Sequence, residues 1–342
     1  MGTDLLLSRD TFRAAVFSRD GHRCVECAAP GRDAHHIVER RLWPDGGYYL
    51  RNGATVCEPC HLRAEQTLLS CDELRVRCGI DGALLPPHLS ADERYDKWGN
   101  VILPSGRRLR GELFDDLSVQ RVLAPVLHLF DLGRVKYPRT YHLPWSPGAT
   151  RDDRVLDDLS ELEGREVVVT VKYDGECTSL YSGGLHARSL DYEPHPSRSR
   201  LRALHASLAH EIPAAWRVCG ENVYARHSIH YQNLPAHFLA FSVWDAQNRC
   251  LSWDETAEWA ALLGLATVSV IYRGVWDEGL LRGLYRPTFE GDELEGYVVR
   301  LAESFHYRDF RRSTAKYVRA YHVQTDKSWM RQVVVPNRLR DS

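Results

Sequence analysis

The stretch Val167-Val168-Val169-Thr170-Val171, followed at once by Lys172-Tyr173-Asp174-Gly175, is the most informative part of this chain. Unbroken runs of β-branched residues are typical of strands that are buried on both faces. A lysine at the end of such a strand is costly unless it has a task, because an ordinary lysine is an ammonium at pH 7 and cannot attack an electrophile. Burial or a nearby cation lowers the pKa of lysine and frees its lone pair. We therefore expect Lys172 to be a nucleophile with a lowered pKa.

Lysine is scarce in this chain, whereas arginine carries most of the positive charge. The five lysines are Lys97, Lys136, Lys172, Lys316 and Lys327. Arginine stays protonated and cannot serve as a nucleophile. A lysine that follows a buried strand is therefore notable in this composition.

The composition is that of a soluble protein with room for more than one core. The chain has 342 residues, of which 44% are hydrophobic and 26% are charged. No apolar stretch is as long as a membrane span, and the first ten residues lack a signal-peptide pattern, so we expect a cytoplasmic protein with no membrane partner. A net charge of −2 gives no overall attraction to nucleic acid, which leaves local arginine clusters such as Arg198, Arg200 and Arg202.

The order of periodic segments predicts an α+β protein with three parts. We expect a small cysteine- and histidine-rich domain at 1–70, a linker at 71–133 and a larger domain at 134–342. The linker contains a predicted hairpin, Asn100 to Arg110, and a predicted helix, Asp116 to Phe130. In the larger domain strand-like runs alternate with helices, and we find no internal repeat.

Several polar motifs follow Lys172 in a fixed order, each at a predicted strand or strand end. They are Arg188-Ser189, Cys219-Gly220-Glu221-Asn222-Val223-Tyr224 with His227-Ser228-Ile229, the aromatic strand Phe238 to Phe241, Glu295-Gly296-Tyr297, and Lys316-Tyr317-Val318-Arg319. This ordered set resembles the covalent nucleotidyltransferase superfamily of polynucleotide ligases and capping enzymes, over roughly residues 134 to 330. The short tail after Lys316 is most similar to the RNA ligase 2 branch, whose ATP-grasp-like ligase domain has antiparallel sheets with flanking helices.

The resemblance implies a role for each matched residue. Lys172 would take AMP from ATP, and Asp174 and Gly175 would shape its turn. Arg188 would hold a 5′-phosphate or the nucleotide phosphates, and Phe241 would stack on adenine. Glu221 would bind the ribose or assist a metal. Glu295 would help to bind a catalytic Mg²⁺ or Mn²⁺, and Lys316 would neutralise the α-phosphate.

The last motif departs from the pattern of that branch. The resembling proteins often have a second lysine two places after the first, where this chain has Val318. Arg319 is the candidate replacement for a phosphate contact. Nucleotidyl transfer depends mainly on positioning and on cations that spread charge over the phosphate oxygens, which fits a set of lysines, arginines and glutamates.

The amino-terminal region carries two C-x₂-C steps. Cys24, Cys27, Cys57 and Cys60 have the spacing of a closed tetrahedral zinc site. A structural Zn²⁺ would hold together a domain that is too small for a large core.

Histidines and an asparagine accompany these cysteines. Their order resembles the HNH endonuclease family, whose fold is a ββα-metal unit. The resemblance implies that His35 and His61 bind a catalytic divalent ion, that His36 is the general base, and that Asn52 fixes the loop carrying the base. The alternative is a zinc module that only binds nucleic acid.

These observations predict an HNH-like zinc domain fused to an ATP-dependent RNA ligase. The ligase would join 3′-hydroxyl and 5′-phosphate ends through a lysyl-AMP intermediate, using ATP, Mg²⁺ or Mn²⁺ and Zn²⁺, in nucleic-acid repair or processing. Its partner would be RNA, either as a nicked duplex or as an RNA–DNA hybrid. The rival functions are a DNA ligase, a capping-type guanylyltransferase, and a damage sensor with an inactive zinc module.

Overall fold

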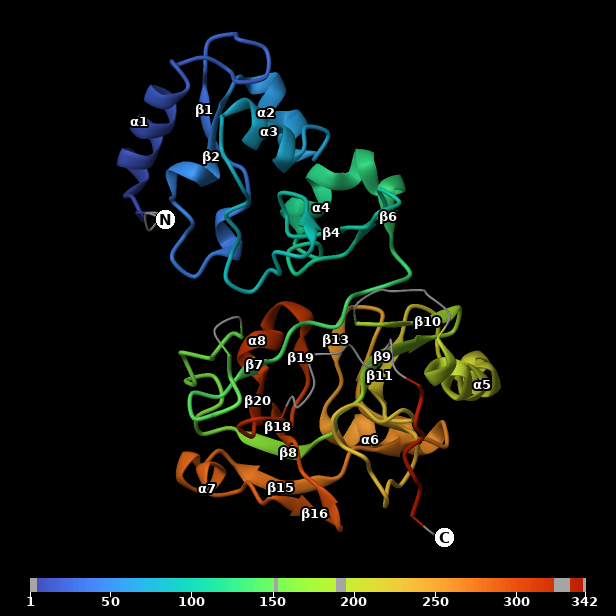
Figure 1. The fold of residues 1–342 in the computed structure, drawn as a ribbon. Coiled ribbons are helices and arrows are strands. Elements are labelled where there is room, and N and C mark those ends of the chain that lie inside the picture. Colours follow the sequence, from blue (N-terminus) through green and yellow to red (C-terminus); the bar gives the residue numbers. More distant parts are fainter. Residues whose placement is uncertain (1–4, 151–152, 189–194, 323–332, 341–342) are drawn as a thin grey trace. The chain divides into compact units, whose positions relative to one another are not determined.

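The computed structural model divides the chain into two units, Met1–Lys136 and Tyr137–Ser342. It describes residues 5–150, 153–188, 195–322 and 333–340 (Figure 1). Helices and strands are mixed throughout, as the α+β prediction requires. In the described part of the chain, no helix is both long and apolar enough to cross a membrane.

The amino-terminal unit begins with a helix, two strands and a second helix. Helix α1 (Arg9–Arg19) starts at Ser8, whose side chain accepts a hydrogen bond from the N–H of Thr11. Strand β1 (Asp33–His36) pairs antiparallel with β2 (Gly53–Val56), and α2 (Glu58–Glu65) follows with a proline in its first turn. Residues of β2 and α2 share one small core with the cysteines.

The residues that we expected to form a linker fold as part of the amino-terminal unit. The predicted hairpin is confirmed in β4 (Val101–Ile102) and β5 (Arg108–Leu109). The predicted helix is α-helical only in its first part and continues as a 3₁₀ helix from Ala124, next to Pro125, which cannot donate the hydrogen bond that an α-helix needs. The region has its own apolar core around Trp98 and Phe130. Its elements are α3 (Cys71–Arg77), β3 (Arg94–Tyr95), β4 (Val101–Ile102), β5 (Arg108–Leu109), α4 (Leu117–Leu123), η3 (Ala124–Leu129) and β6 (Phe130–Asp131).

The carboxyl-terminal unit contains two larger sheets. The first has the strand order β10-β9-β11-β12-β13-β19, with β14 paired to β12, and the second has the order β15-β8-β18-β20-β7. The strands are β7 (Tyr141–His142), β8 (Glu166–Lys172), β9 (Glu176–Tyr181), β10 (Gly184–Ala187), β11 (Arg217–Asn222), β12 (Phe238–Trp244), β13 (Arg249–Cys250), β14 (Ala266–Thr267), β15 (Val270–Val275), β18 (Gly296–Leu301), β19 (Phe305–His306) and β20 (Thr314–Val318). A two-stranded sheet of β16 (Thr288–Phe289) and β17 (Asp292–Glu293) completes the unit.

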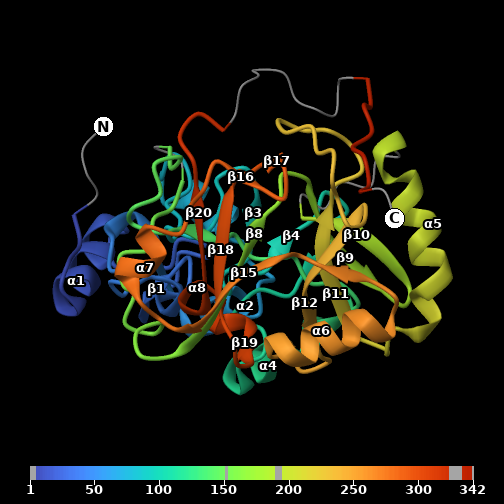
Figure 2. The same cartoon turned by 90° about the horizontal axis from the view of Figure 1, so that it is seen from below.

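Apolar clusters join the two larger sheets to each other and to the helices. Val167 and Val169 of β8 lie in one cluster with Trp244 of β12, whereas Val168 lies in a second cluster. Strand β8 is thus buried on both faces, which explains its unbroken β-branched sequence. A third cluster joins β11 and β12 to α5 (Ser199–Leu208) and α6 (Trp253–Leu262), which lie beside the first sheet in Figure 2. The shorter helices are α7 (Glu278–Arg282) and α8 (Phe310–Ser313).

Gly296 occupies a position on β18 where no side chain fits. A Cβ added there would lie 1.9 Å from the carbonyl oxygen of Tyr317 on the neighbouring strand. Because that oxygen belongs to the backbone of β20, it cannot move aside without disturbing the pairing of β18 with β20.

We therefore expect Gly296→Ala to destabilise the carboxyl-terminal unit by about 1–3 kcal/mol or more, since overpacking forces backbone shifts. Urea unfolding measures this. Gly183→Ala is the matched control, because a Cβ at Gly183 has no atom within 4 Å. Equal unfolding midpoints for the two variants would contradict this account of β18.

Candidate functional site

Alternate residues of three neighbouring strands face one cavity in the carboxyl-terminal unit. In the strand register, Thr170 of β8 lies opposite Val298 of β18, which in turn lies opposite Lys316 of β20. Lys172 is two residues after Thr170, so it points to the same side of the sheet. All four side chains line a cavity of about 500 Å³, a size typical of small-molecule sites.

The first sheet supplies the opposite wall of this cavity. Cys177 of β9 lies opposite Glu221 of β11, and both line the cavity together with Phe241 of β12. Arg188, just after β10, and His227 also line it. The structure therefore brings together the predicted site residues Lys172, Gly175, Arg188, Glu221, Phe241 and Lys316.

Glu295 binds Lys172 directly. The Nζ of Lys172 lies 2.6 Å from both carboxylate oxygens of Glu295. The register explains this contact, because Lys172 lies opposite Gly296, the residue after Glu295. The Lys172 side chain is 23% exposed and that of Glu295 is 5% exposed, so the pair lies at the cavity wall with one side open.

The expected lowering of the pKa of Lys172 is wrong for this state of the protein. Burial does lower the pKa of Lys172, but the charge of Glu295 and its hydrogen bonds with Lys172 outweigh burial and raise it. Lys316, by contrast, does have a lowered pKa. Burial and the positive charge of Lys172 lower the pKa of Lys316 to about 8. Burial, reinforced by the charge of Glu295, also raises the pKa of Glu221 to about 8.

Asp174 and Gly175 fix the turn after Lys172. One carboxylate oxygen of Asp174 accepts hydrogen bonds from the N–H groups of Ser228 and Ile229, at 2.7 and 3.0 Å. A Cβ on Gly175 would lie 2.6 Å from the carbonyl oxygen of Asn222. Asp174 thus holds the loop at 228–229 against the turn that follows Lys172.

Arg319 does not replace the missing lysine at the cavity wall. Its guanidinium lies 2.9 Å from Glu293, and Arg319 is absent from the residues that line the cavity. Val318 is buried. Its N–H donates a hydrogen bond to Ser146 and its C=O accepts one from Gly148, both in the loop that follows β7. A phosphate contact of Arg319 therefore stays a prediction.

The sequence analysis missed two charged residues at the cavity, Arg139 and Asp153. Both line it, and Arg139 lies 3.1 Å from Asp153. Burial opposes the ionisation of Asp153, but hydrogen bonds from Thr150 outweigh burial and lower the pKa of Asp153 to about 2. Neither residue lies in a regular element or a recognisable motif, so no sequence signal marked them. By contrast, Arg198 from the predicted basic cluster is buried against Glu176 and is not a surface charge.

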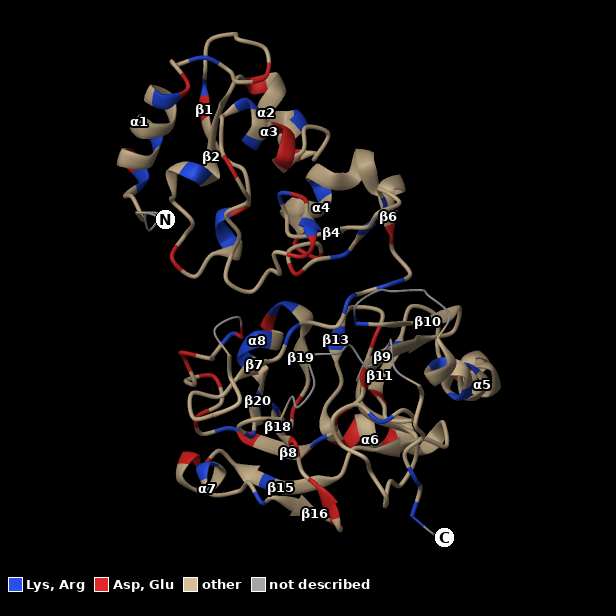
Figure 3. Ribbon diagram, in the orientation of Figure 1, with Lys and Arg blue, Asp and Glu red and all other residues tan. Residues whose placement is uncertain are grey.

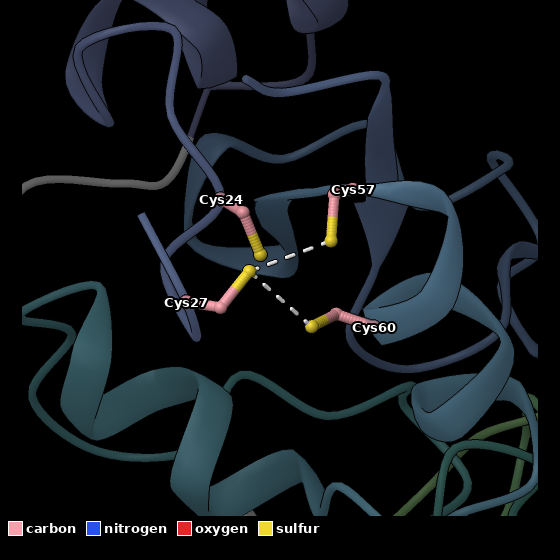
Figure 4. A group of neighbouring side chains, drawn as sticks. All are labelled: Cys24, Cys27, Cys57 and Cys60. Atoms are coloured by element: carbon pink, nitrogen blue, oxygen red, sulfur yellow. Dashed lines mark hydrogen bonds between the residues drawn. The ribbon is translucent and has the colours of Figure 1, made fainter. Parts of the chain in front are cut away.

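In the amino-terminal unit, the four predicted zinc ligands converge. The side chains of Cys24, Cys27, Cys57 and Cys60 point toward one another (Figure 4), and their sulfur atoms all lie within 4.8 Å of one another. Sulfur pairs are 3.5 and 3.8 Å apart, close to the separation of about 3.8 Å that tetrahedral Zn–S bonds of about 2.3 Å give. All nine cysteines are free thiols, and backbone hydrogen bonds lower the pKa of Cys24 to about 7 despite its burial.

His35 and His61 also converge, and they do so on a third residue that the sequence analysis missed. Ligand atoms of His35, His61 and Glu65 lie within 4.8 Å of one another. The signal for Glu65 is its spacing of four residues from His61, which places both on one face of α2. His35 is 3% exposed, and neither of its ring nitrogens makes a hydrogen bond among the described residues. A buried neutral imidazole whose acceptor nitrogen makes no hydrogen bond fits a metal ligand.

His36 and Asn52 lie beside this group. The ring of His36 stacks on Phe12 at 4.6 Å, and its Nε2 has no hydrogen-bond partner among the described residues. Burial and the charge of Lys97 lower the pKa of His36 to about 4. Asn52 is 1% exposed and bonds to the N–H and C=O of Val38, so it holds the loop that follows His36.

The comparisons with known proteins concern the carboxyl-terminal unit. Residues 165–318 match the family model described as RNA ligase. Two similar solved structures are a Naegleria gruberi RNA ligase mutant with AMP and Mn (13% identity, TM-score 0.40, 54% of this chain and 56% of the other) and an archaeal ATP-dependent RNA ligase (16%, 0.36, 54% and 48%). A putative ATP-dependent DNA ligase from Aquifex aeolicus is also similar (18%, 0.34, 54% and 50%).

This chain spans about half the length of those structures. No curated protein matches it. The family match includes Lys172, Glu221, Glu295 and Lys316, and these residues surround or adjoin the one cavity described above. The segment 165–318 is therefore similar to the RNA ligase family, and its matched polar residues lie at the cavity.

The ion pair gives a direct test of the electrostatics of this cavity. Removing the charge of Glu295 removes the largest effect that raises the pKa of Lys172, so Glu295→Gln should move its titration down by about one pH unit or more. Nitrogen-15 NMR of labelled lysine measures this, with the signal assigned through Lys172→Arg. Glu293→Gln is the control, because Glu293 pairs with Arg319 outside the cavity. Identical titrations for the two variants would show that Glu295 does not set the charge of Lys172.

Proposed function

We propose that the carboxyl-terminal unit is an ATP-dependent RNA ligase that joins 3′-hydroxyl and 5′-phosphate ends through lysyl-AMP. The observation that carries this proposal is the cavity in which Lys172 and Lys316 face Glu221 and Phe241. The RNA ligase family match over residues 165–318 supports RNA as the substrate. The rivals are a DNA ligase and a capping-type guanylyltransferase.

The proposed reaction begins with adenylation of Lys172. Its neutral amine attacks the α-phosphorus of ATP, the N–P bond forms, the bond to the β-phosphate oxygen breaks, and pyrophosphate leaves. Since Lys172 is paired with Glu295 and protonated without ATP, the amine has to lose a proton and leave that ion pair first. Lys316 would offset charge on the α-phosphate, and the aromatic ring of Phe241 offers a surface for adenine.

Two further transfers complete the proposed cycle. A 5′-phosphate oxygen of the RNA takes the AMP from Lys172, which breaks the N–P bond. A 3′-hydroxyl then attacks that 5′-phosphate, forms the phosphodiester and releases AMP. Glu221 and Glu295 are the residues that would hold Mg²⁺ or Mn²⁺, which would neutralise phosphate charge. Arg188 at the cavity mouth would bind a phosphate of the RNA or the nucleotide.

Incubation with α-labelled ATP and Mg²⁺ tests this proposal. The wild-type protein should form an acid-stable AMP adduct, and Lys172→Ala should form less than about one-hundredth as much, because an attacking group is lost entirely. Lys136→Ala is the matched control, since Lys136 pairs with Glu93 in the other unit. Labelling by GTP and not by ATP would favour the guanylyltransferase, and no adduct with either nucleotide would favour the damage sensor.

We propose a second function, a metal-dependent nuclease, for the amino-terminal unit. The specific observation is the group His35, His61 and Glu65 next to the unpartnered ring nitrogen of His36. A divalent ion at this group would stabilise charge on a phosphodiester, and His36 would take a proton from the attacking water. The adjacent cysteine cluster would hold a structural Zn²⁺.

Cleavage of plasmid and of RNA in Mg²⁺ or Mn²⁺ tests the nuclease. His36→Ala should lower the cleavage rate by about 10²-fold or more, the usual contribution of a general base. His22→Ala is the control, because His22 is an exposed histidine of the same unit. Equal rates for His36→Ala and the wild type would show that His36 is not the general base. If the wild type cleaves neither substrate, the unit is not a nuclease, and the alternative of a module that only binds nucleic acid is favoured.

A further inference from the structure

A short loop far along the chain from the histidines, Asp96–Asn100, has a rigid polar framework. Asp96 is 2% exposed, and its Oδ1 accepts hydrogen bonds from the N–H groups of Trp98 and Asn100, at 2.9 and 3.1 Å. The side chain of Asn100 also bonds to Asp96, and it accepts a hydrogen bond from Gly111 at 2.7 Å. The framework fixes the residues between its ends, among them Lys97 and Trp98.

Lys97 extends its amine into the group formed by His35, His61 and Glu65. Its Nζ donates a hydrogen bond to the carbonyl oxygen of His36 at 3.0 Å and lies 3.2 Å from Glu65 Oε1 and 3.3 Å from Glu39 Oε2. The Lys97 side chain is only 4% exposed. It is thus a buried ammonium that a substrate cannot reach, and its contacts lie within the protein.

Backbone contacts fasten the same loop to both sides of the group. The indole N–H of Trp98 donates to the carbonyl oxygen of Glu65 at 2.8 Å, and the carbonyl oxygen of Lys97 accepts from the N–H of Glu39 at 2.9 Å. The first contact holds the end of α2, and the second holds the chain that follows His36. The loop therefore touches both elements that carry the histidines.

Glu65 is the point on which these contacts converge. Its Oε1 lies 3.1 Å from Nε2 of His61, 3.4 Å from Nδ1 of His35 and 3.2 Å from Nζ of Lys97. A glutamate side chain loses conformational entropy when it is held in one position. The ammonium of Lys97 already holds the carboxylate of Glu65 in place. A cation that binds there therefore does not have to order the Glu65 side chain.

The formal charges around the group leave room for a divalent cation. Asp33, 3.6 Å from Nδ1 of His61, Glu39 and Glu65 contribute three negative charges, and Lys97 and Arg41, which lies 3.1 Å from Glu39, contribute two positive charges. The sum is about −1 when the histidines are neutral, so the net charge of the group attracts a cation. Asp33 also lies on the side of His61 opposite Glu65, as an orienting carboxylate does at many metal-bound histidines.

We propose that the loop Asp96–Asn100 completes a divalent-cation site of His35, His61 and Glu65, with Lys97 as the positioning residue that holds Glu65 and the backbone of His36. This inference rests on the proposed nuclease site. It implies that the amino-terminal metal site does not end at residue 70 and that 71–111 belongs to the functional module. Imidazole and carboxylate ligands suit Mn²⁺ among other first-row cations, so Mn²⁺ is a suitable probe.

Mn²⁺ binding to the full-length, zinc-loaded protein tests the inference, with titrations followed by calorimetry and by electron paramagnetic resonance. The relevant site is the one that His61→Ala removes. Lys97→Met should raise its Kd for Mn²⁺ by about 10-fold or more, the range known for residues that orient metal ligands. Lys97→Arg should recover much of the affinity, because it restores a cation next to Glu65. Lys136→Met is the matched control.

Zinc content and near-ultraviolet circular dichroism, measured on the same samples, show whether each variant is folded. If Lys97→Met is folded and binds Mn²⁺ as tightly as the wild type, or more tightly, the positioning role is overturned while the nuclease site stands. If the wild type binds no Mn²⁺ that His61→Ala removes, the proposed nuclease site and the inference are both overturned.

Discussion

The ion pair between Lys172 and Glu295 is the constraint on which the account of the carboxyl-terminal unit depends. It forms because β8 and β18 pair in a register that puts Lys172 opposite Gly296, next to Glu295. The same register places Thr170, Val298 and Lys316 on one face, so the strands that make the core also build the cavity. A shift of one residue would turn these side chains to the other face.

The charges around Lys172 do not favour the neutral amine that a nucleophile needs. Glu295 keeps Lys172 protonated, and Lys316 has the lowered pKa. In the proposed reaction, ATP and a divalent ion would bring charges that compete for these carboxylates. Both signs of charge are distributed over the ribbons of each unit (Figure 3), in keeping with the net charge of −2, so any attraction of RNA would have a local origin.

Much of the carboxyl-terminal unit could be predicted because its signals are local. The β-branched run of β8 and the motif residues lie on strands whose sequences mark them, and the order of motifs indicated that they meet. Arg139 and Asp153 could not be predicted in the same way, because they reach the cavity through irregular segments. The ion pair of Arg319 with Glu293 could not be predicted either, since only the fold shows that Glu293 lies within reach of Arg319.

In the amino-terminal unit, too, some features could be predicted from the sequence and others could not. The spacing of the cysteines predicted a cluster whose sulfur atoms do converge. The role of 71–133 was not predictable, because Lys97 meets Glu65 only through tertiary packing, and a lone buried lysine leaves no periodic signal. The contacts of Trp98 and Lys97 with α2 and with the chain that includes His36 tie the supposed linker to the region that carries the cysteine cluster.

The central claim is that Lys172 forms the covalent bond to the nucleotide. Peptide mapping by mass spectrometry, after incubation with ATP and Mg²⁺, tests it most directly. The account predicts one added AMP on the peptide that contains Lys172 and none on the peptides that contain Lys136 or Lys316. An adduct on another residue, with the Lys172 peptide unmodified, would contradict it.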